Sequence, residues 1–402
     1  MHCKSLAGLW LLAGLVLSLT NPASRADDTA IDWRKDAAGR YLDERAKAWF
    51  EFGDAARGEG ATKTACVSCH TLAPYAIARP VLRKLAGKEP PSEYETRLLA
   101  QTRMRVAQWD ELDSSKYALW YDFDEPKAHQ SWGTESVLNA FILAFDDRRE
   151  ERPEPSEATR QAFANLWRTQ ESAGDERGSW DWLNFNYEPW ESPGGRYYGA
   201  VLAAIAVATA PGYYQPGADP RTDEHVALVR DYLRDRREKQ NTFNRLWLMW
   251  ASRGLDGLLT PDEREASIAK VLELQQDDGG WRLASLGEFK RHDETRQSTA
   301  SDGYATGLVL HVLQTVGVPK NGPHVARGLS WLRANQSPSG AWTATSLNME
   351  MSNGAPSSGR TSIGRDTRSP RSKHAPGFGD CATATEPTSV INVATTRRTG
   401  RF

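Results

Sequence analysis

The sequence predicts an all-α protein built from repeated pairs of helices. An amphipathic segment that ends in Gln and is followed by a Gly turn and a Trp recurs at Gln170, Gln276 and Gln336. The last two copies end in Trp281 and Trp342. A repeat of a few tens of residues is typical of arrays in which each unit is a pair of helices.

Each unit also holds a second segment that is apolar on nearly all sides. These segments cover residues 74–85, 134–145, 198–209 and 304–316. A polar-faced helix paired with an apolar helix predicts two layers, with the apolar helices inside. The units cover residues 41–87, 92–147, 156–211, 223–258 and 262–317, and a last unit starts at 322 and lacks its inner helix.

The repeated Gln, Gly and Trp are expected to hold neighbouring units together. The Gln amide can donate to carbonyls at the end of its helix and accept from free N–H groups of the next helix. The Gly permits the turn, and the Trp indole packs over it. A weaker copy lies at residues 240–247. These residues therefore have a structural role and no catalytic one.

The segments KVLELQQDDGGW and GLSWLRANQSPSGAW resemble the Gln-Trp repeats of squalene-hopene cyclases and protein prenyltransferase β-subunits. The resemblance implies an α/α toroid of about six helix pairs, the last incomplete. It also implies a hydrophobic small-molecule ligand, such as an isoprenoid. It supports the fold more than the reaction.

The two ends of the chain differ from this body. Residues 1–26 read as a signal peptide, with Lys4, an apolar run and small residues before an expected cleavage near Ala26. An uncleaved membrane anchor is the alternative; cleavage leaves no membrane span. Residues 349–402 are rich in Ser, Gly, Thr and Arg, which predicts a disordered or frame-altered tail. The toroid therefore covers 27–348, in a periplasmic or secreted protein.

The most specific short motif is a C-x-x-C-H sequence, Cys66, Cys69 and His70, in the first unit. It predicts a covalent haem c, with thioethers to both thiols and His70 as an axial ligand of the iron. Export agrees with this, because haem is attached outside the cytoplasm. A Cys66–Cys69 disulfide and a metal site completed elsewhere are the alternatives, and zinc is disfavoured because no second C-x-x-C exists.

An acidic segment is the candidate for catalysis. Class II terpene cyclases use a D-x-D-D loop as a general acid, and the nearest match here is Asp122, Asp124 and Glu125. A solvated acidic turn is the alternative. Protein prenyltransferases instead bind zinc through an Asp-Gly-Cys, where this chain has Asp302-Gly303-Tyr304. Without that Cys, Asp302 is better interpreted as a helix cap.

The remaining features are the charge balance, an aromatic loop and several isolated His and Met residues. Lys and Arg number 50 against 52 Asp and Glu, so bulk charge does not indicate nucleic-acid binding. The aromatic loop at 180–191 either stacks against a ligand or covers an edge of the rim of the predicted toroid. His292, His311 and His324 lack metal spacing and are expected to be ordinary surface or helix residues. Met104 and His129 are only weak candidates for a sixth haem ligand.

These observations predict an exported toroid with a haem that serves redox chemistry or electron transfer on a hydrophobic ligand, with a redox partner. Two other functions stay open. The protein could be a cyclase-like enzyme that uses the acidic segment, or a periplasmic binding module without catalysis.

Overall fold

The protein is mostly helical, as the sequence predicts. The structure, a computed structural model, describes residues 33–58, 63–87, 90–112, 125–291, 296–344 and 347. These residues form eleven α-helices, four short 3-10 turns and one two-stranded hairpin. The predicted signal peptide and tail, 1–26 and 349–402, lie outside the described residues.

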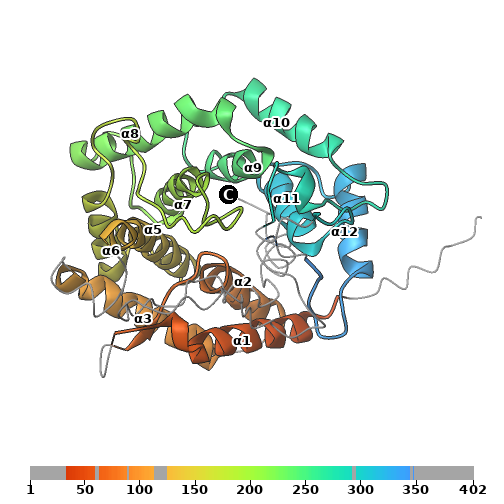
Figure 1. The fold of residues 1–402 in the computed structure, drawn as a ribbon, viewed down its shortest axis with the longest axis horizontal. Coiled ribbons are helices and arrows are strands. Elements are labelled where there is room, and N and C mark those ends of the chain that lie inside the picture. Colours follow the sequence, from red (N-terminus) through yellow and green to blue (C-terminus); the bar gives the residue numbers. More distant parts are fainter. Residues whose placement is uncertain are drawn as a thin grey trace, which may run out of the picture. The chain divides into compact units, whose positions relative to one another are not determined.

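The helices alternate along the chain between two sets. The more exposed set is α1 (Lys35–Glu51), α3 (Glu93–Ala107), α6 (Glu157–Arg168), α8 (Pro220–Arg236), α10 (Pro261–Glu273) and α12 (Pro323–Ala334). The more buried set is α2 (Leu72–Leu85), α5 (Glu125–Arg149), α7 (Gly195–Thr209), α9 (Thr242–Ala251) and α11 (Gly303–Thr315). Figure 1 shows the second set nearer the centre of the view, and its members contact one another in chain order.

The buried helices are those whose sequences are apolar on every side. In α7, the run GAVLAAIAV is buried throughout. The four predicted apolar segments fall within α2, α5, α7 and α11, with α11 ending one residue before the predicted limit. Asp302 caps α11, since its carboxylate accepts the N–H groups of Ala305 and Leu283, each at 2.7 Å. The interpretation of Asp302 as a cap is therefore confirmed.

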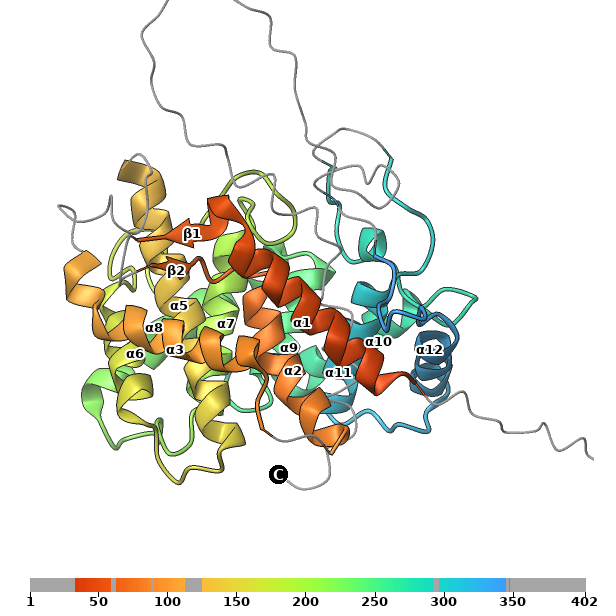
Figure 2. The ribbon, with the colours of Figure 1, turned by 90° about the horizontal axis from the view of Figure 1, so that it is seen from below.

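The remaining elements are short. The 3-10 turns are η1 (Gly53–Ala55), η3 (Trp109–Leu112), η4 (Arg237–Lys239) and η5 (Leu283–Ser285). The antiparallel hairpin pairs β1 (Ala56–Arg57) with β2 (Thr64–Ala65), beside the C-terminal end of α1 in Figure 2. It leads directly into the C-x-x-C-H motif. Within the described residues, the helices are all too short or too polar to cross a membrane.

The repeated glutamines join consecutive exposed helices. Gln170 Nε2 donates to the carbonyls of Gly178, in its own turn, and His225, in α8, at 3.3 and 3.1 Å. Gln275 Nε2 repeats this with Gly279 and His324, in α12, at 2.8 and 2.9 Å. In both copies the ring Nδ1 of the histidine donates back to the Gln carbonyl oxygen at 2.7 Å. One side chain thus bonds its own turn and the next exposed helix.

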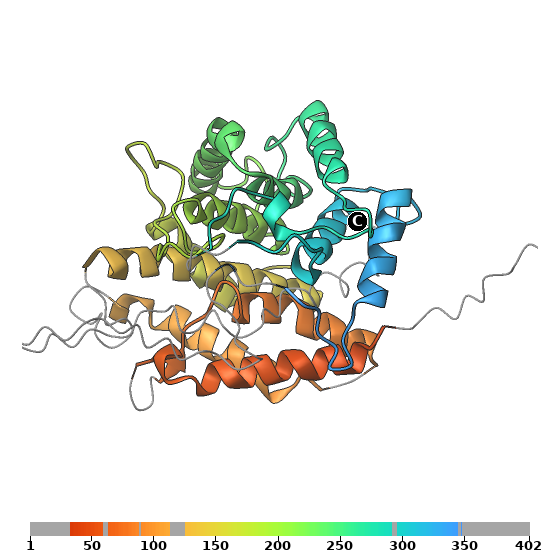
Figure 3. The same cartoon turned by 45° about the vertical axis from the view of Figure 1, so that its right-hand side comes forward.

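The third copy joins the end of the repeat region to its beginning. Gln336 Nε2 donates to the Gly340 carbonyl at 2.9 Å, and its Oε1 accepts the backbone N–H of Arg34 at 2.7 Å. Arg34 is the residue before α1, so the contact bridges 302 positions of sequence. Figure 3 shows the end of the last exposed helix, in blue, close to the start of the first, in red.

A glycine in the turn of each copy lies directly against the next exposed helix. Gly178 and Gly340 have φ of +93° and +90°, a conformation that glycine adopts without strain. A Cβ at Gly178 would lie 2.2 Å from the Leu228 carbonyl oxygen, and one at Gly340 would lie 2.2 Å from the Ala38 nitrogen. Any larger residue would push the neighbouring helix away.

Two details of the predicted contact were wrong. In the second copy, Gln275 rather than Gln276 reaches the next helix. The indoles also do more than pack, because each donates to a carbonyl near the end of its own exposed helix: Trp180 to Leu166 at 2.8 Å, Trp281 to Val271 at 2.8 Å and Trp342 to Leu332 at 2.7 Å. In the weaker copy, Gln240 Nε2 bonds Arg236 within its own segment.

The adjacent glutamines Gln275 and Gln276 offer a matched test of the contact. We expect Gln275→Ala to lower the free energy of unfolding by about 1–3 kcal/mol, because it leaves the polar groups of the turn and of α12 without their partner. Gln276→Ala should change it by less than about 0.5 kcal/mol, because Gln276 Nε2 bonds Leu274 in its own turn. Urea unfolding measures both, and equal losses would contradict the assigned role.

Candidate functional site

The C-x-x-C-H motif forms a tight, buried turn at the start of α2. The Cys66 N–H donates to the Ala55 carbonyl at 2.7 Å, and the Cys66 carbonyl accepts the Trp49 indole N–H at 2.7 Å. Ser68 Oγ then accepts the backbone N–H groups of His70 and Thr71, at 3.3 and 3.1 Å. These bonds fix the direction in which the Cys69 and His70 side chains leave the turn.

A carboxylate from a distant loop completes the cluster. Cys69 Sγ donates to Glu191 Oε1 at 3.4 Å, and His70 Nε2 lies 3.8 Å from the same oxygen. One ligand atom from each of these three side chains lies within 4.8 Å of the other two. Glu191 precedes α7 and is held by two backbone bonds with Tyr187, each at 2.9 Å. Two segments far apart in sequence thus supply sulfur, nitrogen and oxygen to one point.

Burial opposes charge on every member of this cluster. It raises the pKa of Cys66 to about 11 and raises that of Cys69 well above its ordinary value. It lowers the pKa of His70 to about 4 and raises that of Glu191 to about 7. Each charged form would lose its hydration without a full counter-charge. The thiols and the imidazole are therefore uncharged at neutral pH.

Aromatic rings enclose the imidazole. The His70 ring centroid lies 6.1 Å from that of Trp49 and 5.6 Å from that of Trp190. Trp190 in turn meets Tyr304 of α11 edge-on at 5.5 Å. Trp182 meets Tyr198 of α7 edge-on at 5.9 Å between ring centroids, and its indole donates to the Trp190 carbonyl at 2.8 Å. The aromatic loop thus packs against α7 and α11 and covers this end of the buried helices. Of its two predicted roles, this geometry favours covering the rim.

The predicted haem would be held by Cys66, Cys69 and His70 of this turn. Cys66 and Cys69 are free thiols here, so both could form thioethers. His70 Nε2, the nitrogen that would bind the iron, lies 3.8 Å from Glu191 Oε1, and Trp49 and Trp190 pack beside the imidazole. Haem attachment stays a prediction from the sequence.

The other sequence candidates lie elsewhere. Asp122 and Asp124 are outside the described residues, and of Glu125 only the backbone, at the start of α5, is described. His129 is exposed and pairs with Asp181 at 2.9 Å. His292 is also outside the described residues, and Met104 lies in α3.

His311 and His324 both lie in helices, which is one of the two settings that the sequence predicts. His311 is buried in α11 against Trp250, with ring centroids 4.4 Å apart. His324 is part of a contact between exposed helices. Neither is an ordinary surface residue, because each faces a neighbouring helix that the sequence alone did not reveal.

A cavity of about 1150 Å³ lies at the other end of the buried helices. It is lined by residues 75–85 of α2, by the N-terminal half of α3, and by the C-terminal ends of α5, α7, α9 and α11. Its apolar wall includes Ile77, Leu98, Phe145, Ile205 and Trp250. Cys69, His70 and Glu191 are not among the residues that line it, although the lining reaches Tyr75 in the first turn of α2.

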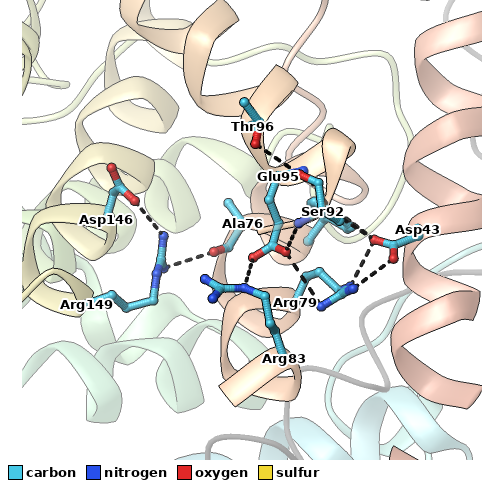
Figure 4. Close-up of polar contacts among 10 residues, drawn as sticks. Asp43, Ala76, Arg79, Arg83, Ser92, Glu95, Thr96, Asp146 and Arg149 are labelled. Carbon is cyan, nitrogen blue, oxygen red and sulfur yellow. Dashed lines mark hydrogen bonds and ion pairs between the residues drawn. The ribbon is translucent and has the colours of Figure 1, made fainter. Parts of the chain in front are cut away.

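Ion pairs tie the polar side of the cavity together. Arg83 Nε lies 3.2 Å from Glu95 Oε1, and Arg149 pairs with Asp146 at 3.3 Å (Figure 4). Arg149 also donates to the Ala76 carbonyl at 3.0 Å, which joins α5 to α2. These contacts fix the helix ends around the cavity and leave its apolar wall as the main binding surface.

Glu191 was not singled out from the sequence as a partner of the motif. It appeared only as one acidic residue of the aromatic loop, and nothing in its spacing points to Cys69, 122 positions earlier. Its place at the end of a loop directly before an apolar inner helix is the signal that could have found it. The Cys motif occupies the same place before α2.

His311 predicts a pH dependence of stability. Burial lowers its pKa from 6.5 to about 4, so between these values the unfolded chain binds the proton more tightly. As the pH falls from 6.5 to 4, the wild type should lose up to about 3 kcal/mol of unfolding free energy relative to His311→Gln. Urea unfolding at several pH values measures the difference, and parallel profiles would contradict the assigned burial.

Comparison with protein-family models and with curated proteins finds no match for this chain. A function therefore has to be inferred from the cavity, the cluster and the way the helices enclose them.

Proposed function

We propose that this protein is an exported α/α toroid of the squalene cyclase and prenyltransferase type that binds an apolar or amphiphilic small molecule between its inner helices. The cavity of about 1150 Å³ is the observation that carries the proposal. Pockets for drug-sized ligands measure roughly 300–1,000 Å³ and are mostly apolar. This one is large enough for a long hydrocarbon chain.

The toroid is supported by the connectivity of the helices. Exposed and buried helices alternate through the chain, and the buried ones contact each other in order. The Gln336–Arg34 contact brings the last exposed helix back to the first, as a closed ring requires. A sixth inner helix, which the sequence predicts to be lacking, would follow Trp342, where only residues 343, 344 and 347 are described.

The cavity lining indicates the class of ligand. Its lining combines an apolar wall with charged residues of both signs, the basic Lys84, Arg148 and Arg253 and the acidic Glu150 and Glu151 among them. An acyl or isoprenoid chain with a polar or anionic head would match both surfaces. Binding needs only this shape, whereas cyclase chemistry would also need the carboxylates of Asp122 and Asp124. A binding role is therefore the function that the geometry supports best.

The proposal can be tested by narrowing the cavity. Ala208 lines it from α7, and Ala266 is exposed on α10 and serves as the matched control. We expect Ala208→Phe to weaken binding of anilinonaphthalene sulfonate, and its displacement by farnesol, by at least about tenfold, or 1.4 kcal/mol. Ala266→Phe should leave both unchanged.

Fluorescence titration of the purified full chain measures both variants. Urea unfolding of each would verify that the substitution leaves the fold intact. Binding that is absent from the wild type, or unaffected by either substitution, would exclude the cavity as the ligand site.

A further inference from the structure

We propose that Cys69, His70 and Glu191 form a mononuclear centre for a borderline-soft divalent cation, with Zn²⁺ as the best match. Among the described residues, these three bring sulfur, nitrogen and oxygen donors within 4.8 Å of one another. None of the three residues lines the cavity. The metal site and the proposed ligand binding therefore depend on different residues.

The spacing of the donors suits a tetrahedral ion. Glu191 Oε1 lies 3.4 Å from Cys69 Sγ and 3.8 Å from His70 Nε2. Bond lengths of about 2.3 Å to sulfur and about 2.0–2.2 Å to nitrogen and oxygen place neighbouring ligands at comparable separations. Side-chain rotations alone would bring the three atoms around a common centre.

The charges also balance. The Cys69 thiol would lose its proton to solvent as the sulfur–metal bond forms, since the thiolate is the ligand. A thiolate, a carboxylate and a neutral imidazole then carry two negative charges, which a divalent cation cancels. This matters because all three side chains are buried, and a net charge in that position would be costly.

Neighbouring groups already hold the ligands in position. Thr71 Oγ1 lies 3.3 Å from His70 Nδ1, which leaves Nε2 directed toward Glu191. A hydrogen bond to the ring nitrogen that does not bind the metal commonly orients a histidine ligand. Ser68 fixes the turn on one side and the Tyr187–Glu191 backbone pair fixes the other.

The sequence disfavours zinc because it lacks a second pair of cysteines. Glu191, which comes from a distant loop, supplies a ligand in their place. Zinc sites with three protein ligands keep a fourth position for water or substrate. The donor set thus resembles a reactive zinc centre more than a closed structural one.

Metal content and variants test the proposal. The exported, full-length protein would be freed of metal with a chelator and titrated with Zn²⁺, and with Co²⁺ as a spectroscopic probe. We expect one tightly bound ion per chain and a sulfur-to-cobalt charge-transfer band. Glu191→Gln and Cys69→Ser should each weaken Zn²⁺ binding by more than the ~10–100-fold loss that follows when only a hydrogen-bond partner of a ligand is changed.

Cys66→Ser is the matched control, because Cys66 is buried beside the cluster but contributes no donor to it. It should keep the stoichiometry and the cobalt band. Helical circular dichroism and farnesol displacement should stay unchanged in all variants that fold, which separates a failed metal site from a failed ligand cavity. A Glu191→Gln protein that still binds Zn²⁺ as the wild type does would overturn the proposal.

Haem is the other outcome that would overturn it. Intact mass spectrometry of protein exported from cells competent for cytochrome c maturation would then show the added mass of a haem. That mass should disappear in Cys66→Ser,Cys69→Ser protein and persist in Glu191→Gln. Direct metal ligation predicts no such mass, and it predicts sensitivity to Glu191 rather than to Cys66.

Discussion

A single glutamine amide shared between two exposed helices is the contact on which the rest of this fold depends. Each amide donates to the carbonyl of its own turn and to a carbonyl of the next exposed helix, as Gln275 does with Gly279 and His324. A buried amide left without these partners costs more than the bonds themselves contribute. At the three junctions of Gln170, Gln275 and Gln336, hydrogen bonds therefore hold one exposed unit against the next, beside the packing of the apolar inner helices.

The first unit has an indole contact like those of the later copies, but here the Trp lies on the helix and the accepting carbonyl lies on the turn. Elsewhere the indole sits on the turn and donates to its helix, as Trp342 does to Leu332. In the first unit Trp49 sits on the helix and donates to Cys66 on the turn. The C-x-x-C-H motif thus takes the structural place of a Gly-x-Trp turn. This explains how a cluster of reactive side chains can be built into a repeat without interrupting it.

The sequence predicted what depends on local pattern. The apolar inner helices, the repeated turns and the Asp302 cap all follow from residue types at short spacing, and each is present. What it could not predict depends on how distant segments meet. The choice between Gln275 and Gln276 is set by the rotation of the last helical turn, and the approach of Glu191 to Cys69 by the path of a long aromatic loop.

The inner helices give the cluster and the cavity opposite electrostatic settings. Cys69 and Glu191 precede the N-termini of α2 and α7, where the positive end of the helix dipole favours negative charge. The cavity lies at the C-terminal ends, where Lys84 and Arg149 offset the opposite partial charge. Burial raises the pKa of the Cys69 thiol and of the Glu191 carboxyl, whereas the helix ends favour their anions. The proposed cation between them would resolve this conflict, because its charge would offset the cost of burying a thiolate and a carboxylate.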